Sequence, residues 1–279
     1  MMAHEMNLSS NDPGCIIFMI DQSGSMGNEW RGTGQTLAYG SAKAVNSVLA
    51  EVAARCKKGE EISPRVRVGL FGYSEPSGVR KVDWASANTS PEADGLMCIS
   101  TIATVNEEVL DVEEEKYIPW VVHEDFGGGT PMMLAFHEVL GVAEAFAQNH
   151  PNSFPPIIIN VTDGRPTDMD TQDIPNEVHP LSSIATADGH ALICNVHLSE
   201  TQEAPAFLPA SEDALPDEFS KNLFRASSVV PEAMANVGRE RIKGIEIPEN
   251  ARLFAYNADP TLLVQLLTLA SSVPTVNKE

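Results

Sequence analysis

Apolar runs of strand length are the feature that most limits how this chain can fold. Cys15–Asp21 (CIIFMID) and Pro156–Thr162 (PIIINVT) are apolar without alternation, which is typical of strands buried on both faces of a parallel sheet. Arg65–Tyr73 alternates before it becomes apolar, and His190–Leu198 is a further apolar run. We therefore predict a sheet whose two faces are both covered, which requires a layer of helices on each side.

The segments between these runs carry helical spacing. Apolar residues recur every three or four positions over Gly34–Lys57, and Pro131–Gln148 and Asp173–Ala187 are further predicted helices. A last strand, Arg252–Tyr256, precedes a helix that begins near Asp259. Strands that alternate with helices predict an α/β fold, doubly wound, with a mostly parallel central sheet flanked by helices.

The length of 279 residues allows one large α/β domain or two small ones. The alternation of strands and helices continues over residues 14–273, so we expect a single domain there, with tails at 1–13 and 274–279. Two longer stretches interrupt it as insertions, near 74–125 and 199–250.

The insertions carry weaker signals. Val79–Trp84 and Trp120–His123 are candidate short strands in the first one. The acidic segment Asn106–Glu115 is interpreted either as an exposed insertion or as a solvated helix. Asp217–Arg225 and Pro231–Val237 are candidate short helices in the second insertion.

The charge balance excludes some classes of partner. There are 18 basic and 39 acidic residues, for a net charge of −21. Nucleic acids and anionic membrane surfaces bind clustered Lys and Arg, so both are unexpected partners. An acidic surface attracts cations and basic partners, and a solvated surface without specific meaning is an equal alternative.

The cysteines and the termini indicate a cellular compartment. The four cysteines, at positions 15, 56, 98 and 194, form no Cys-x-x-Cys pair, which argues against a zinc site and suits a reducing cytoplasm. Neither a signal peptide nor a membrane-length apolar run is present. We expect a soluble cytoplasmic protein.

Three polar clusters stand next to the predicted elements. Asp21-Gln22-Ser23-Gly24-Ser25 and Thr162-Asp163-Gly164 follow buried strands, and Gly129-Thr130-Pro131 precedes a helix. We expect Thr130 at the N-cap of that helix, with Pro131 in its first position. In an open α/β sheet such loops gather at the edge where ligands bind.

The candidate ligands are Asp21, Ser23, Ser25, Thr130 and Asp163, and all of them supply oxygen. Hard oxygen ligands select Mg²⁺, Ca²⁺ or Mn²⁺ over zinc or copper. Two carboxylates and three hydroxyls leave room for water, which suits Mg²⁺ best.

These five residues, in this order and context, resemble the metal-ion-dependent adhesion site of von Willebrand factor A domains, whose loop has the pattern Asp-x-Ser-x-Ser followed by a distant Thr and a distant Asp. The resemblance covers residues 14–272, and the closing segment LFAYNADPTLLVQLLTLAS is similar to intracellular bacterial members of the TerY type. It implies that Ser23 and Ser25 coordinate the ion directly, Thr130 directly or through water, and Asp21 and Asp163 mainly through water.

The resemblance also implies a function without catalysis. An open coordination position on the ion would take a Glu or Asp from a protein partner. In members of this kind the partner is a kinase, phosphatase or ATPase encoded nearby, in stress-response or signalling complexes. These are expectations by analogy with the family.

Other interpretations remain open at this stage. A hydrolase or phosphatase could use the Asp21–Ser25 loop, although the loop lacks a second Asp two residues on and no nucleophile elbow or Asp-x-x-His occurs. Asp168 and Asp170 are interpreted as turn and cap residues, and His197 as a core or edge residue of its strand.

Overall fold

The computed structural model describes residues 4–75, 78–81, 95–102, 127–198 and 203–272. Its centre is one sheet of eight strands in the order β13-β14-β12-β9-β1-β6-β7, with β8 also paired to β6. The strands are β1 (Gly14–Asp21), β6 (Val66–Ser74), β7 (Gly78–Lys81), β8 (Met97–Cys98), β9 (Ile157–Thr162), β12 (Leu192–His197), β13 (Ala206–Phe207) and β14 (Phe254–Tyr256).

The five central strands, from β14 to β6, run parallel, and β7, β8 and β13 are antiparallel strands at the two margins. Short hairpins lie outside the sheet: β2 (Glu29–Trp30) with β3 (Gln35–Thr36), β4 (Lys57–Lys58) with β5 (Glu61–Ile62), and β10 (Ala185–Thr186) with β11 (Gly189–His190).

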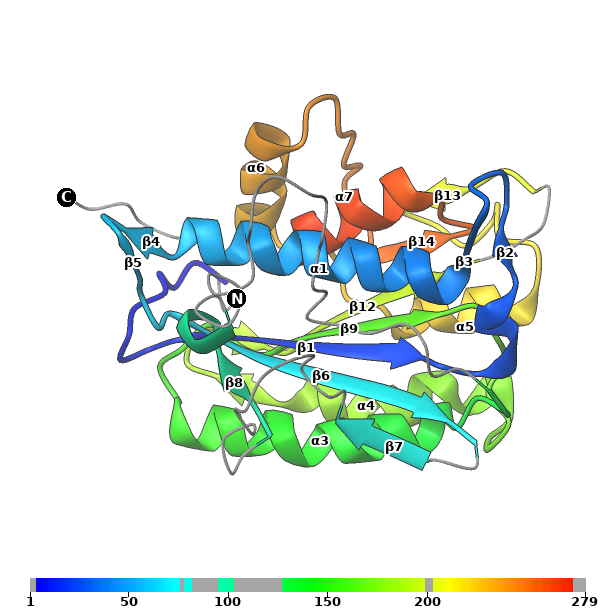
Figure 1. Ribbon diagram of the computed structural model, residues 1–279, viewed down its shortest axis with the longest axis horizontal. Helices are drawn as coiled ribbons and strands as arrows, with labels where there is room; N and C mark the ends of the chain where they lie inside the picture. Colours follow the sequence, from blue (N-terminus) through cyan, green and yellow to red (C-terminus); the bar gives the residue numbers. More distant parts are fainter. Residues whose placement is uncertain (1–3, 76–77, 82–94, 103–126, 199–202, 273–279) are drawn as a thin grey trace.

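Helices cover both faces of the sheet (Figure 1). One layer contains α1 (Leu37–Arg55), α6 (Glu232–Arg241) and α7 (Pro260–Ala270), and the other contains α3 (Met132–Asn149), α4 (Ile174–Ser183) and α5 (Glu218–Ala226). Two 3₁₀ turns, η1 (Gly24–Gly27) and η2 (Thr171–Asp173), lie between these elements. The predicted fold class, α/β and doubly wound with a mostly parallel sheet, is confirmed.

Alternation along β1 explains the two layers. Ile16, Phe18 and Ile20 belong to the core under α1 and α7, whereas Ile17 and Met19 belong to the core under α3, α4 and α5. A strand that is apolar at every position therefore has a partner for each side chain. We call the second side of the sheet the α3 face.

The predicted elements recur with shifted ends. The helix expected over Asp173–Ala187 is α4, which ends at Ser183, because Ala185 and Thr186 pair with the hairpin strand β11. The candidate helices of the second insertion are α5 and α6. Asn106–Glu115, Trp120–His123 and the tail 274–279 lie outside the described residues.

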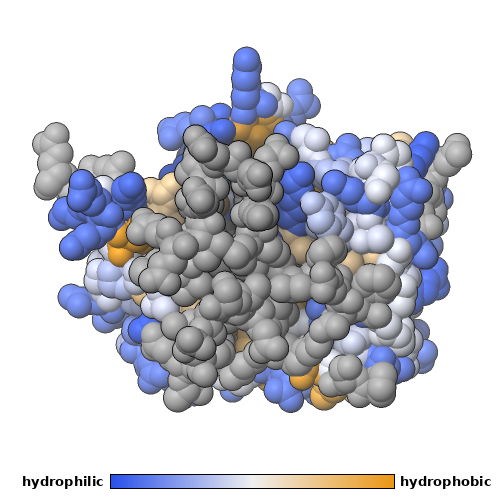
Figure 2. Space-filling model, in the orientation of Figure 1, coloured by the Kyte–Doolittle hydropathy of each residue, from blue (hydrophilic) through white to orange (hydrophobic). Residues whose placement is uncertain are grey.

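The N-terminal residues pack along the β10–β11 hairpin. The backbone amides of Glu5 and Met6 donate to the Asp188 carboxylate at 3.0 and 2.9 Å, and Leu8 is buried beside Gly14. Figure 2 shows hydrophilic side chains gathered around the margin of the face that it views. No described helix combines the length and the apolar character that membrane crossing requires.

Candidate metal centre

A row of side chains crosses the sheet where its parallel strands end, which we call the carboxyl edge. Strand pairing places Tyr73 beside Asp21 and Thr162 beside His197. The Thr162 hydroxyl donates to the Asp21 carboxylate at 2.6 Å, and His197 stacks on Tyr256 with 4.9 Å between ring centroids. The row therefore runs over β6, β1, β9, β12 and β14 on the α3 face, with Asp21 near one end.

The loop after β1, which carries Ser23 and Ser25, is bonded to the loop after β9, which carries Asp163, through hydroxyls and carboxylates. The Ser23 amide donates to the Asp21 carboxylate at 2.8 Å, which closes the turn after β1. The Ser25 hydroxyl donates to Asp163 at 2.9 Å and lies 3.1 Å from the Ser23 hydroxyl. Asp21 and Ser23 are buried, so these oxygens are held in place before any ligand arrives.

The space beside Gly164 is where side-chain oxygens from two other loops come together. A Cβ added at Gly164 would lie 3.3 Å from Thr130 Oγ1, 3.8 Å from Ser25 Oγ and 3.9 Å from Asp21 Oδ2. Three of the five expected ligands thus converge on one point. Thr130 is more than a hundred residues from Asp21 and Ser25 in the sequence. A side chain at position 164 would occupy part of the space that they enclose.

Backbone hydrogen bonds fasten the three loops to one another. The Gly24 amide donates to the Gly128 carbonyl at 2.9 Å. The Thr167 amide donates to the Thr130 carbonyl at 2.9 Å, and the Thr130 amide donates to the Thr167 hydroxyl at 3.0 Å. Gly128 has φ 71°, and a Cβ there would lie 1.6 Å from the Glu75 carbonyl oxygen. Glycine is therefore required at position 128 for the second loop to approach β6.

The start of α3 differs from the prediction. Thr130 was expected at the N-cap, but α3 begins at Met132 and its N-cap is Pro131. The first-turn amides are capped from another loop, because the Asp168 carboxylate accepts two of them at 2.9 and 3.1 Å. Asp168 is thus a capping residue, as expected, and the Thr130 hydroxyl is left to face Gly164.

The electrostatics of the cluster favour a cation. Burial raises the pKa of Asp21 from 3.8 to about 7, and the neighbouring Asp163 carboxylate raises it too, whereas hydrogen bonds from Thr162 and Ser23 lower it. A divalent ion among these oxygens would offset both the burial and the repulsion.

The donor set fits a hard divalent ion. In the part of the chain that the structure describes, no three His, Cys, Asp or Glu side chains gather as a metal site. The cluster has only two carboxylates, and hydroxyls complete it. Such ligands suit Mg²⁺ or Mn²⁺ with several retained waters.

Some residues of the centre were missed by sequence reasoning. Thr162 was noted only as part of its cluster, yet it bonds Asp21 directly. The Thr167 hydroxyl, in the loop after β9, donates at 2.9 Å to Glu75, which directly follows β6. Thr162 could have been found from its position at the end of an apolar strand run. Thr167 carried no such signal, because its partners Thr130 and Glu75 are distant in the sequence.

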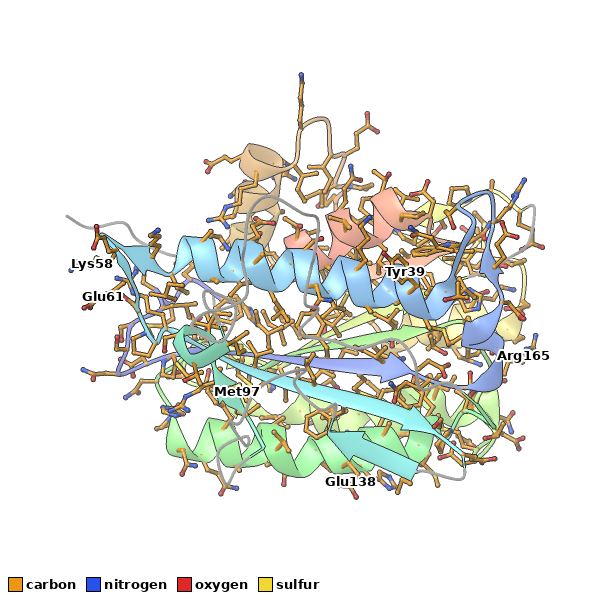
Figure 3. All side chains as sticks on the ribbon, viewed as in Figure 1. Tyr39, Lys58, Glu61, Met97, Glu138 and Arg165 are labelled. Atoms are coloured by element: carbon orange, nitrogen blue, oxygen red, sulfur yellow. The ribbon has the colours of Figure 1, made fainter. Side chains whose placement is uncertain are left out.

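A positive charge lies at the rim of the centre. Arg165 follows Asp163 by two residues and lies at the carboxyl edge of the sheet in Figure 3. Its guanidinium pairs with Asp217, the N-cap of α5, at 2.6 Å, and it lies over the Phe219 ring at 5.8 Å from the centroid. Arg165 therefore connects the loop after β9 to the start of α5.

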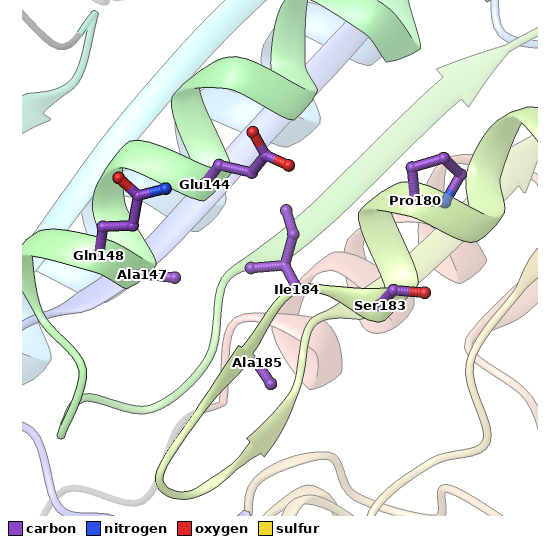
Figure 4. Close-up of a pocket in the computed structure, with 7 residues that line it drawn as sticks. All are labelled: Glu144, Ala147, Gln148, Pro180, Ser183, Ile184 and Ala185. Carbon is purple, nitrogen blue, oxygen red and sulfur yellow. The ribbon is translucent and has the colours of Figure 1, made fainter.

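A shallow groove of about 480 Å³ lies at the opposite edge of the sheet, between the last turns of α3 and α4 (Figure 4). Glu144, Gln148 and Ile184 are among its lining residues. Because α3 begins at the carboxyl edge, its last turns are far from the metal centre. The groove takes no part in that centre.

Together, the fold and the site define a doubly wound α/β protein with a cluster of oxygen ligands at the carboxyl edge. No protein-family model matches the chain, and no curated protein matches it. Among solved structures, proximal thread matrix protein 1 from the mussel byssus, with a zinc-occupied MIDAS motif, is 14% identical over 96% of this chain and 48% of its own, with a TM-score of 0.49.

Two further solved structures are similar at the same low level. Manganese-loaded TRAP protein of Plasmodium vivax is 13% identical over 92% of this chain and 72% of its own, with a TM-score of 0.44. The vWF domain of the pili tip protein Mfa5 from Porphyromonas gingivalis is 16% identical over 58% and 44%, with a TM-score of 0.32. The chain spans less than half of the mussel protein.

Proposed function

We propose that this chain is a von Willebrand factor A domain that binds a protein partner through a divalent ion at the carboxyl edge. The observation that carries the proposal is the convergence of oxygens from Asp21, Ser25 and Thr130 on the space beside Gly164. Those loops are also bonded to one another, so the site is preorganised.

The ligand roles are those that the resemblance to the family implies. Ser23, Ser25 and Thr130 would supply neutral hydroxyl oxygens, and Asp21 and Asp163 would balance the charge through water. An ion with few anionic ligands attracts a further carboxylate. We therefore propose that a Glu or Asp of the partner completes the coordination.

We propose further that the chain is not an enzyme. The Ser25 hydroxyl donates to the Asp163 carboxylate at 2.9 Å. That pairing orients a ligand oxygen, whereas a serine nucleophile needs a base that accepts its proton, most often an imidazole.

The finer proposals concern the ion and the setting. Mg²⁺ is the ion we favour, because the donors are hard and leave room for water. A cytoplasmic setting, in a stress-response or signalling complex like those of bacterial TerY-type proteins, accords with four cysteines that are buried and free. A kinase, phosphatase or ATPase encoded nearby would then be the partner.

The metal site is tested by calorimetric titration of Mg²⁺ into the apo protein. Ser25→Ala and Asp163→Asn should each weaken binding by roughly tenfold or more, because each removes a donor or its orienting partner. Ser47→Ala is the control, since its hydroxyl bonds only the Lys43 carbonyl on the exposed side of α1. Unchanged affinity in both site variants would refute the assignment.

The partner is tested by capture on immobilised protein, with and without EDTA, in wild type and Ser25→Ala. A carboxylate bridge predicts that a bound protein is released by EDTA and does not bind the variant. A partner retained under both conditions would show that the ion is not the bridge.

A further inference from the structure

A buried polar network extends from the metal centre across the α3 face of the sheet. The Tyr73 hydroxyl donates to the Asn160 side-chain oxygen at 2.8 Å, and the Asn160 amide donates to the Asn195 oxygen at 3.1 Å. The Asn195 amide donates to the Ser227 hydroxyl at 3.1 Å. All four residues are buried, with at most 1% of their surface exposed.

The register of the strands makes this network possible. Asn160 pairs with Asn195 directly, and Met19 pairs with Asn160. Both asparagines therefore lie one step below the row that contains Asp21 and Thr162, on the same face. Elsewhere that face is apolar, so polar groups here require partners.

The donors all point the same way, and the network ends on α5. Ser227 donates to the Leu223 carbonyl at 2.8 Å, and Asn195 reaches the same carbonyl at 3.3 Å. Leu223 lies in the last turn of α5, where carbonyls lack partners within the helix. A chain of bonds in one direction admits one orientation of each amide, and its members strengthen one another.

The other end of the network meets the metal centre. Tyr73 is the strand neighbour of Asp21, whose carboxylate accepts the Thr162 hydroxyl. The Tyr73 hydroxyl donates to Asn160, and this bond sets the direction in which the phenol points.

We propose that Tyr73, Asn160 and Asn195 are positioning residues of the metal centre, which hold Thr162 and Asp21 in place and connect them to the end of α5. This inference rests on the proposed metal-binding function. It assigns to the two asparagines an effect on the metal centre itself. A purely structural role would change overall stability without a separate effect on the centre.

The test uses Tyr73→Phe and Asn195→Ala, with Tyr256→Phe as the matched control. Tyr256 is a buried tyrosine on the same face whose hydroxyl donates to Glu203, away from Asp21. In metal-free protein, amide hydrogen exchange is followed at Gly164, which donates to Thr162, and at Ser23, which donates to Asp21. The Ile158 amide, deep in β9, reports global opening.

We expect both variants to speed exchange at Gly164 and Ser23 by more than at Ile158, where the loss of one buried hydrogen bond from overall stability accounts for about tenfold. Both should weaken Mg²⁺ binding by a similar factor, and Tyr256→Phe should change neither. If wild type binds no divalent ion while the two amides still respond, the proposed function fails and the network stands. Exchange at Gly164 and Ser23 that matches wild type, or that rises equally at Ile158, would overturn the proposal.

Discussion

Gly164 is the residue on which the geometry of the metal centre depends most directly. Its missing side chain leaves the space that the oxygens of Thr130, Ser25 and Asp21 enclose, within 3.3 to 3.9 Å of the position that a Cβ would take. The backbone there has an ordinary φ, so the requirement for glycine concerns space and not conformation.

Gly164→Ala should therefore weaken Mg²⁺ binding by roughly tenfold or more, an effect of the size seen when the surroundings of a metal site are disturbed. Stability in EDTA should change little, because the Cβ meets side-chain oxygens and no backbone. Calorimetry and urea unfolding measure the two effects. Gly127→Ala is the control, since a Cβ at that position meets no atom of the described residues within 4 Å. An equal loss in both variants would contradict the prediction.

The start of α3 shows how one element depends on another. Its first-turn amides are capped by Asp168, from the loop after β9, and not by a residue of its own segment. The same loop carries Asp163, so the cap keeps Thr130 and Asp163 in a fixed relation. A change at Asp168 should therefore act on both the helix and the metal centre.

Asp168→Ala is expected to destabilise the protein by about 1 kcal/mol, the typical cost of a lost helix cap, and to weaken Mg²⁺ binding. Urea unfolding in EDTA measures the first effect and calorimetry the second. Asp170→Ala serves for comparison, because Asp170 stands at the N-cap of η2 without a side-chain capping bond. If the two variants were equally stable, the capping account of Asp168 would be wrong.

At the scale of the whole molecule, one buried histidine connects stability to pH. His197 is stacked on Tyr256 against Phe219, and burial lowers its pKa from 6.5 to about 4, with Asp217 raising it and Arg165 lowering it. Below pH 6.5 the unfolded chain binds a proton at His197, whereas the folded chain binds it only near pH 4. Stability is therefore present above pH 6.5 and is lost as the pH falls toward 4.

Between pH 7 and pH 5 this difference should cost the wild type about 2 kcal/mol relative to His197→Gln. Asp21, whose pKa is raised, contributes the opposite trend to both proteins and cancels in the comparison. Urea unfolding in EDTA at the two pH values provides the measurement. Parallel pH profiles for the two proteins would show that His197 does not titrate as described.

Much of the fold followed from local periodicity. Apolar runs and helical spacing predicted the central strands and the main helices, because burial on two faces or on one stripe leaves a direct record in the residue pattern. Helix ends were less predictable. The end of α4 depends on pairing between Ala185 and His190, and the cap of α3 comes from a separate loop, so neither is a property of its own segment.

The two asparagines are a feature of the sequence that hydrophobic periodicity alone does not explain. IIINVT and LICNVH each carry Asn in the fourth position, and the strands pair so that Asn160 meets Asn195. In the sequence, each strand is a mostly apolar run that is interrupted by an asparagine. Only the register shows that the two asparagines are neighbours.

What the sequence determined by itself is the fold class and the set of candidate ligands, because both follow from residue type and from spacing along the chain. Tertiary structure alone decided that Asp21, Ser25 and Thr130 face one space beside Gly164 and that Thr162 and Asp168 support them. Distances between loops far apart in sequence depend on strand register and on hydrogen bonds between backbones. No local pattern encodes those distances.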